Sequence, residues 1–194
     1  AMVSYHFFWD LGFFGYIDLS VVTTGLGLFI AQIIGSSFIL ISGFSLHLSS
    51  LSKNFQKKFW FRTAKLFFLS FLISLATLIF DRNNFIFFGI LHLLTFCSVF
   101  GFFALKIRKT YIIFFLLVIS LIISSMNLKF DLPLYFSWIG LNLILPKSND
   151  FYPVFPWIVF FILGLALAKL KIGDNPENWK SFFYKEDKTH KIEI

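Results

Sequence analysis

The feature that most constrains this chain is a series of long apolar runs separated by short polar connections. Of its 194 residues, 58% are hydrophobic, only 14% are charged, and 31 are phenylalanine. A soluble domain carries about 25% charged residues, so the charge that would keep this chain in water is missing. In lipid, every backbone N–H and C=O must be bonded within the chain, which helices achieve. We therefore predict an all-α integral membrane protein.

The apolar runs predict a polytopic transmembrane helix bundle of about six spans. Because a span needs roughly 20 residues, the first run is too short, and we expect a truncated first helix and a natural chain that begins earlier. The part 127–153 is polar and broken by prolines, and we interpret it as a re-entrant or interfacial piece before the last span. The expected helical runs are 1–11, about 21–49, 63–80, 86–105, 111–126 and 154–170.

Two of these runs carry small residues at a spacing of four. The second run has Gly27, Ala31 and Gly35, and the last run has Gly164 and Ala168. Such stripes let helices approach closely in lipid, because no bulky side chain separates the backbones. We expect these faces to form helix contacts, and we expect that a leftover small-residue face makes a homodimer plausible.

The basic residues predict the orientation. Of the 17 Lys and Arg residues, all lie in the connections 50–65 and 106–110 or in the part from Lys169 onward, except Arg82, Lys129 and Lys147. The positive-inside rule places these basic parts in the cytoplasm. We therefore predict a multi-pass protein of the cell membrane with a cytoplasmic C-terminus. The net charge of +7 then reflects topology, and we expect no nucleic-acid partner.

We expect a domain boundary near the last basic residues. Residues 1–172 form the predicted transmembrane domain, and 173–194 form a cytoplasmic tail that is either an amphipathic helix or disordered. Asn175 and Pro176 resemble a helix start, with Trp179 following among lysines. No role in a site is assigned to His47 or to His190.

His6 and Asp10 are the first candidates for chemistry. They lie one helical turn apart in a strongly apolar run, and ionisable residues at membrane depth usually mark function. A carboxylate beside an imidazole can fix its tautomer and stabilise the imidazolium, as in acyl-transfer sites. We predict that His6 is a general base or a transient acyl carrier and that Asp10 orients it. The alternative is that both residues lie at the water interface.

The predicted topology places further polar residues on the non-cytoplasmic side with His6. These are His92, near the end of its run, and Asp131 and Asp150 in the connection 127–153. Each has a structural alternative, since His92 fits a core histidine and the two aspartates fit turn residues. No tight ligand spacing supports a metal site. The single cysteine, Cys97, lies in an apolar run and excludes a disulfide framework.

Several motifs, taken in order, resemble one family of membrane enzymes. The chain is similar to small prokaryotic members of the membrane acetyltransferase-like family that includes the catalytic domain of heparan-α-glucosaminide N-acetyltransferase. The resemblance covers most of residues 1–170. It rests on five segments, which are Met2–Leu11, Ile41–Leu46, Arg62–Leu66, Phe88–His92 and Asp150–Trp157.

The resemblance implies a function for the candidate residues. It implies transfer of an acetyl-type group from a cytoplasmic acyl-CoA, used as co-substrate rather than as a tightly bound cofactor, to a hydroxyl or amine acceptor on the outer side. The acceptor would be a saccharide or another envelope component. His6 is then the catalytic position with Asp10 beside it. The residues expected to line the acceptor site are His92, Asp150 and Trp157, and those expected near the donor's phosphates are Lys58, Arg62 and Lys65.

A function without catalysis fits the same composition. Paired charges in a helix bundle can also line a polar cavity or bind another chain. The alternative is therefore a non-catalytic membrane scaffold or a small-solute transport subunit. Binding of an acyl-CoA distinguishes the two functions, because a ligand at 100 times its dissociation constant stabilises the folded protein by about 2.7 kcal/mol.

Overall fold

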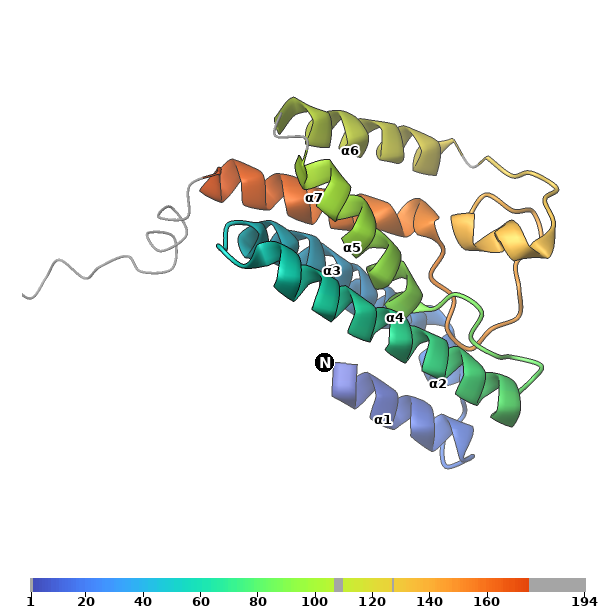
Figure 1. The fold of residues 1–194 in the computed structure, drawn as a ribbon. Coiled ribbons are helices and arrows are strands. Elements are labelled where there is room, and N and C mark those ends of the chain that lie inside the picture. Colours follow the sequence, from blue (N-terminus) through green and yellow to red (C-terminus); the bar gives the residue numbers. More distant parts are fainter. Residues whose placement is uncertain (1, 107–109, 127, 175–194) are drawn as a thin grey trace, which may run out of the picture.

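The computed structural model describes residues 2–106, 110–126 and 128–174, and in this part the protein is helical, with two isolated β-bridges and no strand (Figure 1). This agrees with the predicted all-α class. The predicted tail 173–194 lies outside the described residues from 175 onward. The helices are α1 (Met2–Phe13), α2 (Ser20–Thr23), α3 (Gly25–Ser50), α4 (Phe55–Phe80), α5 (Ile90–Lys106), α6 (Thr110–Ser125), the 3-10 helix η1 (Leu134–Ile139) and α7 (Val154–Ile172).

The centre of the bundle is the pair α3 and α7, which pack along their length. Helix α6 packs on α7, α5 packs on α3 and α4, and α1 contacts the short α2 (Figure 1). The buried core comes mainly from α3, α5 and α7, with Ile39, Leu93, Cys97 and Phe161 at 0% exposure. The outer surfaces of α1 and α4 expose many phenylalanines, as expected of helices that face lipid.

Glycines allow the close approach of α3 and α7. A Cβ on Gly43 would collide with the backbone carbonyl of Phe161, and a Cβ on Gly164 would collide with that of Leu40. The prediction for Gly164 is therefore confirmed. On the predicted stripe of the second run, Gly27 lies against the backbone of α2, whereas Gly35 lies against the ring of Tyr152. The close contact of α3 with α7 uses Gly43, two turns after Gly35, which was not predicted.

Within the described residues, three helices have the length and apolar composition to cross a membrane, namely α3, α4 and α7. Helices α5 and α6 are apolar but shorter. At 1.5 Å per residue, the 17 residues of α5 extend about 25 Å, somewhat less than a hydrocarbon core of about 30 Å. A helical membrane protein follows from these elements, while the count of about six spans stays a prediction.

Helix α4 begins at Phe55, well before the predicted start near 63. The apolar pattern does not reveal this start, because the polar Lys57 and Lys58 interrupt it. In the structure Phe55 and Phe59 pack on Phe102 of α5, and the rings of Phe59 and Phe102 stack with centroids 4.6 Å apart. Burying these rings offsets the cost of ordering the first turns of the helix.

The connection between α6 and α7 contains only the short η1 among its described residues, which fits a part that does not span. Buried Asn142 holds it: its Nδ2 donates to Ser137 Oγ at 2.9 Å, and its Oδ1 accepts from the backbone N–H of Leu132 at 3.2 Å. The depth of this connection in the membrane stays a prediction.

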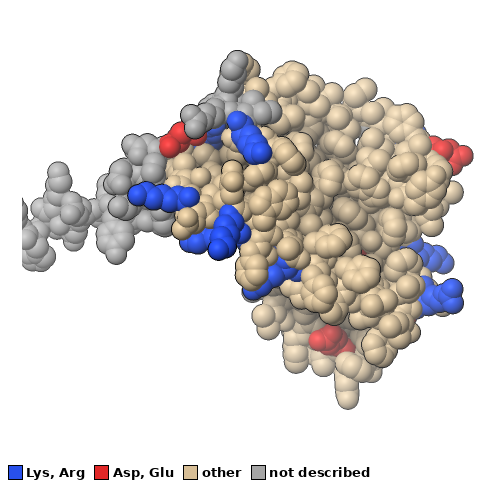
Figure 2. Space-filling model, viewed as in Figure 1, with Lys and Arg blue, Asp and Glu red and all other residues tan. Residues whose placement is uncertain are grey.

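The two ends of the bundle differ in charge (Figure 2). One end, here called the basic end, holds the α3–α4 connection and the last turns of α5 and α7, with Lys53, Lys57, Lys106, Lys169 and Lys171. The opposite end holds the α4–α5 connection and the segment before α7. Alternate connections therefore meet at one end, and the orientation of the bundle in the membrane stays a prediction.

Candidate active site

At the opposite end, two connections pair to hold a carboxylate. The backbone N–H of Asn149 donates to Asn84 O at 3.0 Å, and that of Tyr152 donates to Phe88 O at 3.0 Å. Between these bonds lies Asp150, whose Oδ2 accepts from the backbone N–H of Ile90, the first residue of α5, at 3.0 Å. An unpaired N–H at a helix N-terminus favours an anion in this place.

Gly89 makes room for the Asp150 carboxylate. A Cβ at this position would collide with Asp150 Oδ2, so only glycine fits. The sequence segment Phe88–His92 thus has a local purpose: it ends one connection, leaves space for the anion and starts α5 beneath it. The sequence predicted Asp150 as a site residue. It did not predict that Gly89 leaves space for the carboxylate or that the Ile90 N–H binds it.

Asp150 lies within electrostatic reach of His6. Burial raises the pKa of Asp150, while the N–H of Ile90 and the positive charge of protonated His6 lower it in part. Helix α1 thus brings the predicted catalytic histidine toward a carboxylate that is distant in sequence.

Two tyrosines near the candidate site were not predicted, Tyr152, which interacts with Asp150, and Tyr5, which interacts with Tyr152. Burial raises the pKa of Tyr152 to about 12, and the negative charges of Asp150 and Tyr5 add to the shift. The hydroxyl of Tyr5 donates to Val22 O at 3.2 Å. Both residues stand beside predicted ones, Tyr5 before His6 and Tyr152 after Asp150. A tyrosine close to an ionisable residue in an apolar run could have indicated both of them from the sequence.

Asp10 and His6 are both exposed, one turn apart on α1. In the part of the chain that the structure describes, no hydrogen bond or ion pair joins their side chains. The ring of His6 lies edge-on to the ring of Tyr5, with the two centroids 6.0 Å apart. Their shared helix face agrees with the sequence. The role of Asp10 as the residue that orients His6 stays a prediction.

His92 ties three segments together. The backbone N–H of Gly89 donates to its Nδ1 at 3.3 Å, so Nε2 carries the proton and faces Ser74 Oγ of α4 at 3.2 Å. The Ser74 hydroxyl donates to Ile86 O at 2.6 Å. Both ring nitrogens have protein partners, which is the arrangement of a structural histidine. Contact between His92 and an acceptor stays a prediction.

Trp157 lies in the first turns of α7, next to the Asp150 segment. The centroid of its ring lies 4.7 Å from that of Tyr152 and 6.0 Å from that of Phe160. Trp157 therefore supports the ring of Tyr152 from one side, while Gly35 of α3 leaves room for the tyrosine hydroxyl on another. Its predicted place near the acceptor site is consistent with this position, and its role stays a prediction.

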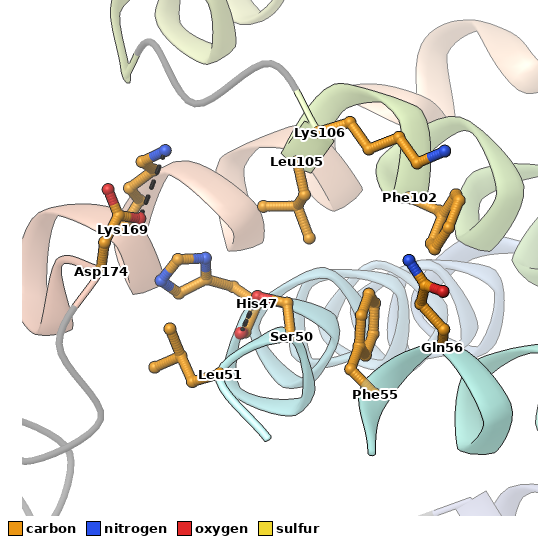
Figure 3. A pocket seen from close by; sticks show the side chains of 10 residues that line it. All are labelled: His47, Ser50, Leu51, Phe55, Gln56, Phe102, Leu105, Lys106, Lys169 and Asp174. Atoms are coloured by element: carbon orange, nitrogen blue, oxygen red, sulfur yellow. Dashed lines mark hydrogen bonds and ion pairs between the residues drawn. The ribbon is translucent and has the colours of Figure 1, made fainter. Parts of the chain in front are cut away.

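Two cavities open at the basic end. The smaller, about 60 Å³, includes Lys58 and Arg62 in its lining, whereas Lys65 lies over the ring of Phe61 at 4.4 Å and does not line it. The larger, about 510 Å³, lies among the ends of α3, α4, α5 and α7 (Figure 3). It is lined by His47, Ser50, Leu51, Phe55, Gln56, Phe102, Leu105, Lys106, Lys169 and Asp174.

The larger cavity was not predicted from the sequence. Its polar residues include His47, which is 1% exposed, and Lys169, which is 5% exposed. Lys169 stands inside the apolar run of α7, where an ionisable residue usually marks a function, but the sequence alone predicts only that it belongs to the basic cytoplasmic part. Among the described residues, no three His, Cys, Asp or Glu side chains lie close enough together to hold a metal ion.

Comparison with known proteins gives one match. The family model described as heparan-alpha-glucosaminide N-acetyltransferase, catalytic, matches residues 1–191. No curated protein and no solved structure matches the chain. The match includes all the candidate site residues at both ends of the bundle. With nearly its whole length matched, the chain belongs to the heparan-alpha-glucosaminide N-acetyltransferase catalytic-domain family.

Proposed function

We propose that this protein is a membrane acyltransferase that moves an acetyl-type group from a cytoplasmic acyl-CoA to a hydroxyl or amine acceptor on the outer side. The family match supports acetyltransferase-like chemistry in a membrane protein. The observation that carries the proposal further is the electrostatic interaction between His6 and Asp150. It places the candidate base near a carboxylate that the Ile90 N–H holds, at the end of the bundle where the acceptor would arrive.

In the proposed reaction, His6 takes the proton of the acceptor hydroxyl or amine as the acceptor attacks the thioester carbonyl. The carbon–sulfur bond breaks, and the proton passes from the imidazolium to the leaving thiolate, so that free CoA and the acylated acceptor result. Alternatively, a neutral His6 accepts the acyl group on nitrogen before passing it on. In both routes Asp150 stabilises the positive imidazole, and Asp10 is proposed to orient it.

The donor is proposed to enter at the basic end, where Lys58, Arg62 and Lys65 would contact its phosphates. The support is the accumulation of positive charge there and the small cavity that Lys58 and Arg62 line. The acceptor is proposed to be a saccharide or another envelope component, near His92, Asp150 and Trp157. We propose that the bilayer surrounds the bundle. We also propose that two copies of the chain can form a homodimer.

Acyl labelling tests the proposed function. The detergent-purified protein is incubated with acetyl-CoA carrying a labelled acetyl group, first without acceptor and then with a mixture of saccharides, and both protein and products are analysed by mass spectrometry. A label on His6 supports the acyl-carrier route, and a labelled saccharide without labelled protein supports direct transfer. His6→Ala should abolish both signals, with His190→Ala as the matched control.

If acetyl-CoA neither raises the melting temperature of the protein nor transfers its acetyl group, the acyltransferase proposal fails. A non-catalytic scaffold or a solute transport subunit then becomes the better account. Full transfer activity in His6→Ala would reject His6 while leaving the reaction itself in place.

A further inference from the structure

The side chain of Tyr152 is held in one place from three sides. Its backbone N–H donates to Phe88 O at 3.0 Å, which fixes the start of the side chain. The centroid of its ring lies 4.7 Å from that of Trp157. On another side, a Cβ on Gly35 of α3 would come within 2.6 Å of the tyrosine hydroxyl oxygen, so the hydroxyl stands close to the backbone of α3. The fold therefore fixes where this hydroxyl lies.

The hydroxyl of Tyr152 is a hydrogen-bond donor that the fold does not use. In the described part of the chain it makes no hydrogen bond, and His47 Nδ1 is the sole buried side-chain polar atom there that lacks one. The Tyr152 hydroxyl is therefore open to molecules outside the protein. The Tyr5 hydroxyl, by contrast, already donates to Val22 O at 3.2 Å. Because a tyrosine hydroxyl that the fold holds in place usually has a partner, its partner here is expected to be a ligand atom.

This free hydroxyl belongs to the same group as the candidate base. The charge of Asp150 interacts with both His6 and Tyr152, and Tyr5 interacts with Tyr152 as well. The Ile90 N–H is already bound to Asp150. Burial raises the pKa of Tyr152 to about 12, and the charges of Asp150 and Tyr5 add to the shift. The hydroxyl thus keeps its proton at neutral pH and can donate it to a hydrogen bond.

The proposed acyl transfer needs such a donor. As the acceptor attacks the thioester carbonyl, one electron pair of the C=O bond moves onto the carbonyl oxygen. The positive charge that forms on His6 lies near Asp150, which balances it, so the new negative charge on the oxygen lacks a partner. Hydrogen-bond donors fixed in advance around such an oxygen are usually the largest single contribution to catalysis. The proposed roles of His6, Asp10 and Asp150 do not supply one.

We propose that the Tyr152 hydroxyl donates a hydrogen bond to the acyl oxygen while that oxygen carries negative charge. This inference rests on the proposed function and adds a catalytic residue to it. Tyr152 keeps its own proton throughout. When the carbonyl re-forms, the carbon–sulfur bond breaks and the thiolate takes the proton that His6 removed from the acceptor. Because packing fixes the hydroxyl beforehand, no rearrangement of the protein is needed when the charge appears.

The conservative variant Tyr152→Phe removes the donor and keeps the ring. Initial rates are measured on the full-length detergent-purified protein with labelled acetyl-CoA and the mixture of saccharides. The kcat should fall by about 10²–10³-fold, while the KM for each substrate changes little, because the bond forms only in the transition state. The melting temperature should stay within about 2 °C of the native value, since the hydroxyl has no protein partner. Tyr135→Phe is the matched control, because Tyr135 is 64% exposed on η1, and it should leave both constants unchanged.

A second replacement reports on the proton of the hydroxyl. With 2,3,5-trifluorotyrosine at position 152, the ring fluorines stabilise the phenolate, so the hydroxyl loses its proton at a much lower pH. The rate should then fall on the alkaline side of the pH profile, whereas the same replacement at Tyr135 should leave the profile of the native protein. A ring that only packs would not move the profile. Since this side chain stays close to tyrosine in shape, the test holds even if Tyr152→Phe fails to fold.

The outcomes separate this inference from the proposed function. If the native protein transfers the acetyl group and Tyr152→Phe keeps the native kcat, the inference is overturned and the proposed function stands. A loss confined to the KM of either substrate, or an unchanged pH profile with trifluorotyrosine, overturns it in the same way. If the native protein transfers no acetyl group, the proposed function fails and the inference fails with it.

Discussion

Asp150 accepts a 3.0 Å hydrogen bond from the backbone N–H of Ile90, and this contact joins the segment before α7 to the first residue of α5. Sixty residues separate the two in sequence. The bond fixes an anion at a helix N-terminus, where the helix dipole favours it. From this place the carboxylate interacts with His6 of α1, so three distant parts of the chain define the proposed reaction centre.

The first prediction compares the two aspartates near His6. Asp150→Asn should lower acyl transfer on the order of 10²-fold, because a fixed charge that stabilises the imidazolium is lost while the shape is kept. Asp10→Asn should have a smaller effect, since Asp10 is exposed and the structure gives it no bond to His6. Initial rates at saturating donor measure both. The reverse order of effects would restore Asp10 as the main partner of His6.

The second prediction concerns pH. Burial raises the pKa of Asp150, so above the ordinary aspartate value of about 3.9 the folded protein keeps a proton that the unfolded chain has lost. The stability that this adds is fully present below the ordinary pKa and is lost as pH rises through the raised value. The melting temperature of the native protein should therefore fall relative to Asp150→Asn as pH rises through this window. Parallel curves for the two proteins would contradict the buried carboxylate.

The third prediction uses two glycines of α3. Gly43→Ala places a methyl group against the backbone carbonyl of Phe161, which can move only if α3 and α7 separate, and should cost about 1–3 kcal/mol. Gly35→Ala meets the hydroxyl end of Tyr152, which can rotate away, and should cost less. Both positions are helical, so the gain in helix propensity is shared. Thermal unfolding in detergent compares them, and equal losses would contradict the tight contact at Gly43.

The fourth prediction concerns the connection before α7. Asn142→Ala leaves the Leu132 N–H without its partner, at a cost of about 1–3 kcal/mol, and removes the donor to Ser137 Oγ, whose hydroxyl still donates to Ile144 O. Asn149→Ala removes an amide that is exposed, and should change stability by less than about 0.5 kcal/mol. Chemical unfolding of both variants provides the comparison. A loss for Asn149→Ala as large as that for Asn142→Ala would count against the buried network.

The fifth prediction tests the orientation. Cys97 is the single cysteine and is 0% exposed, so new cysteines can be labelled against an unreactive background. In intact cells a membrane-impermeant thiol reagent should label Lys147→Cys at the opposite end but not Lys57→Cys at the basic end. Permeabilised cells should allow labelling of both. Labelling of Lys57→Cys alone in intact cells would reverse the proposed topology.

The apolar pattern alone located most of the helices. The ends of α3, α5, α6 and α7 lie close to the predicted ones, because an apolar run in lipid must be helical whatever its neighbours are. The start of α4 was missed, since lysines masked it and only the contact of Phe59 with Phe102 shows why the helix extends there. Local composition carries no information about a ring on another helix.

The sequence by itself determined the membrane class, the family resemblance and the candidate residues His6 and Asp150, because hydropathy and motifs are properties of the chain. Only the tertiary structure decided which groups meet. It brought Asp150 to Ile90 and within electrostatic reach of His6, and it buried His47 and Lys169 around one cavity. The reason is physical: spacing along a helix fixes which residues share a face, whereas contacts between helices depend on packing, here set by Gly43 and Gly164.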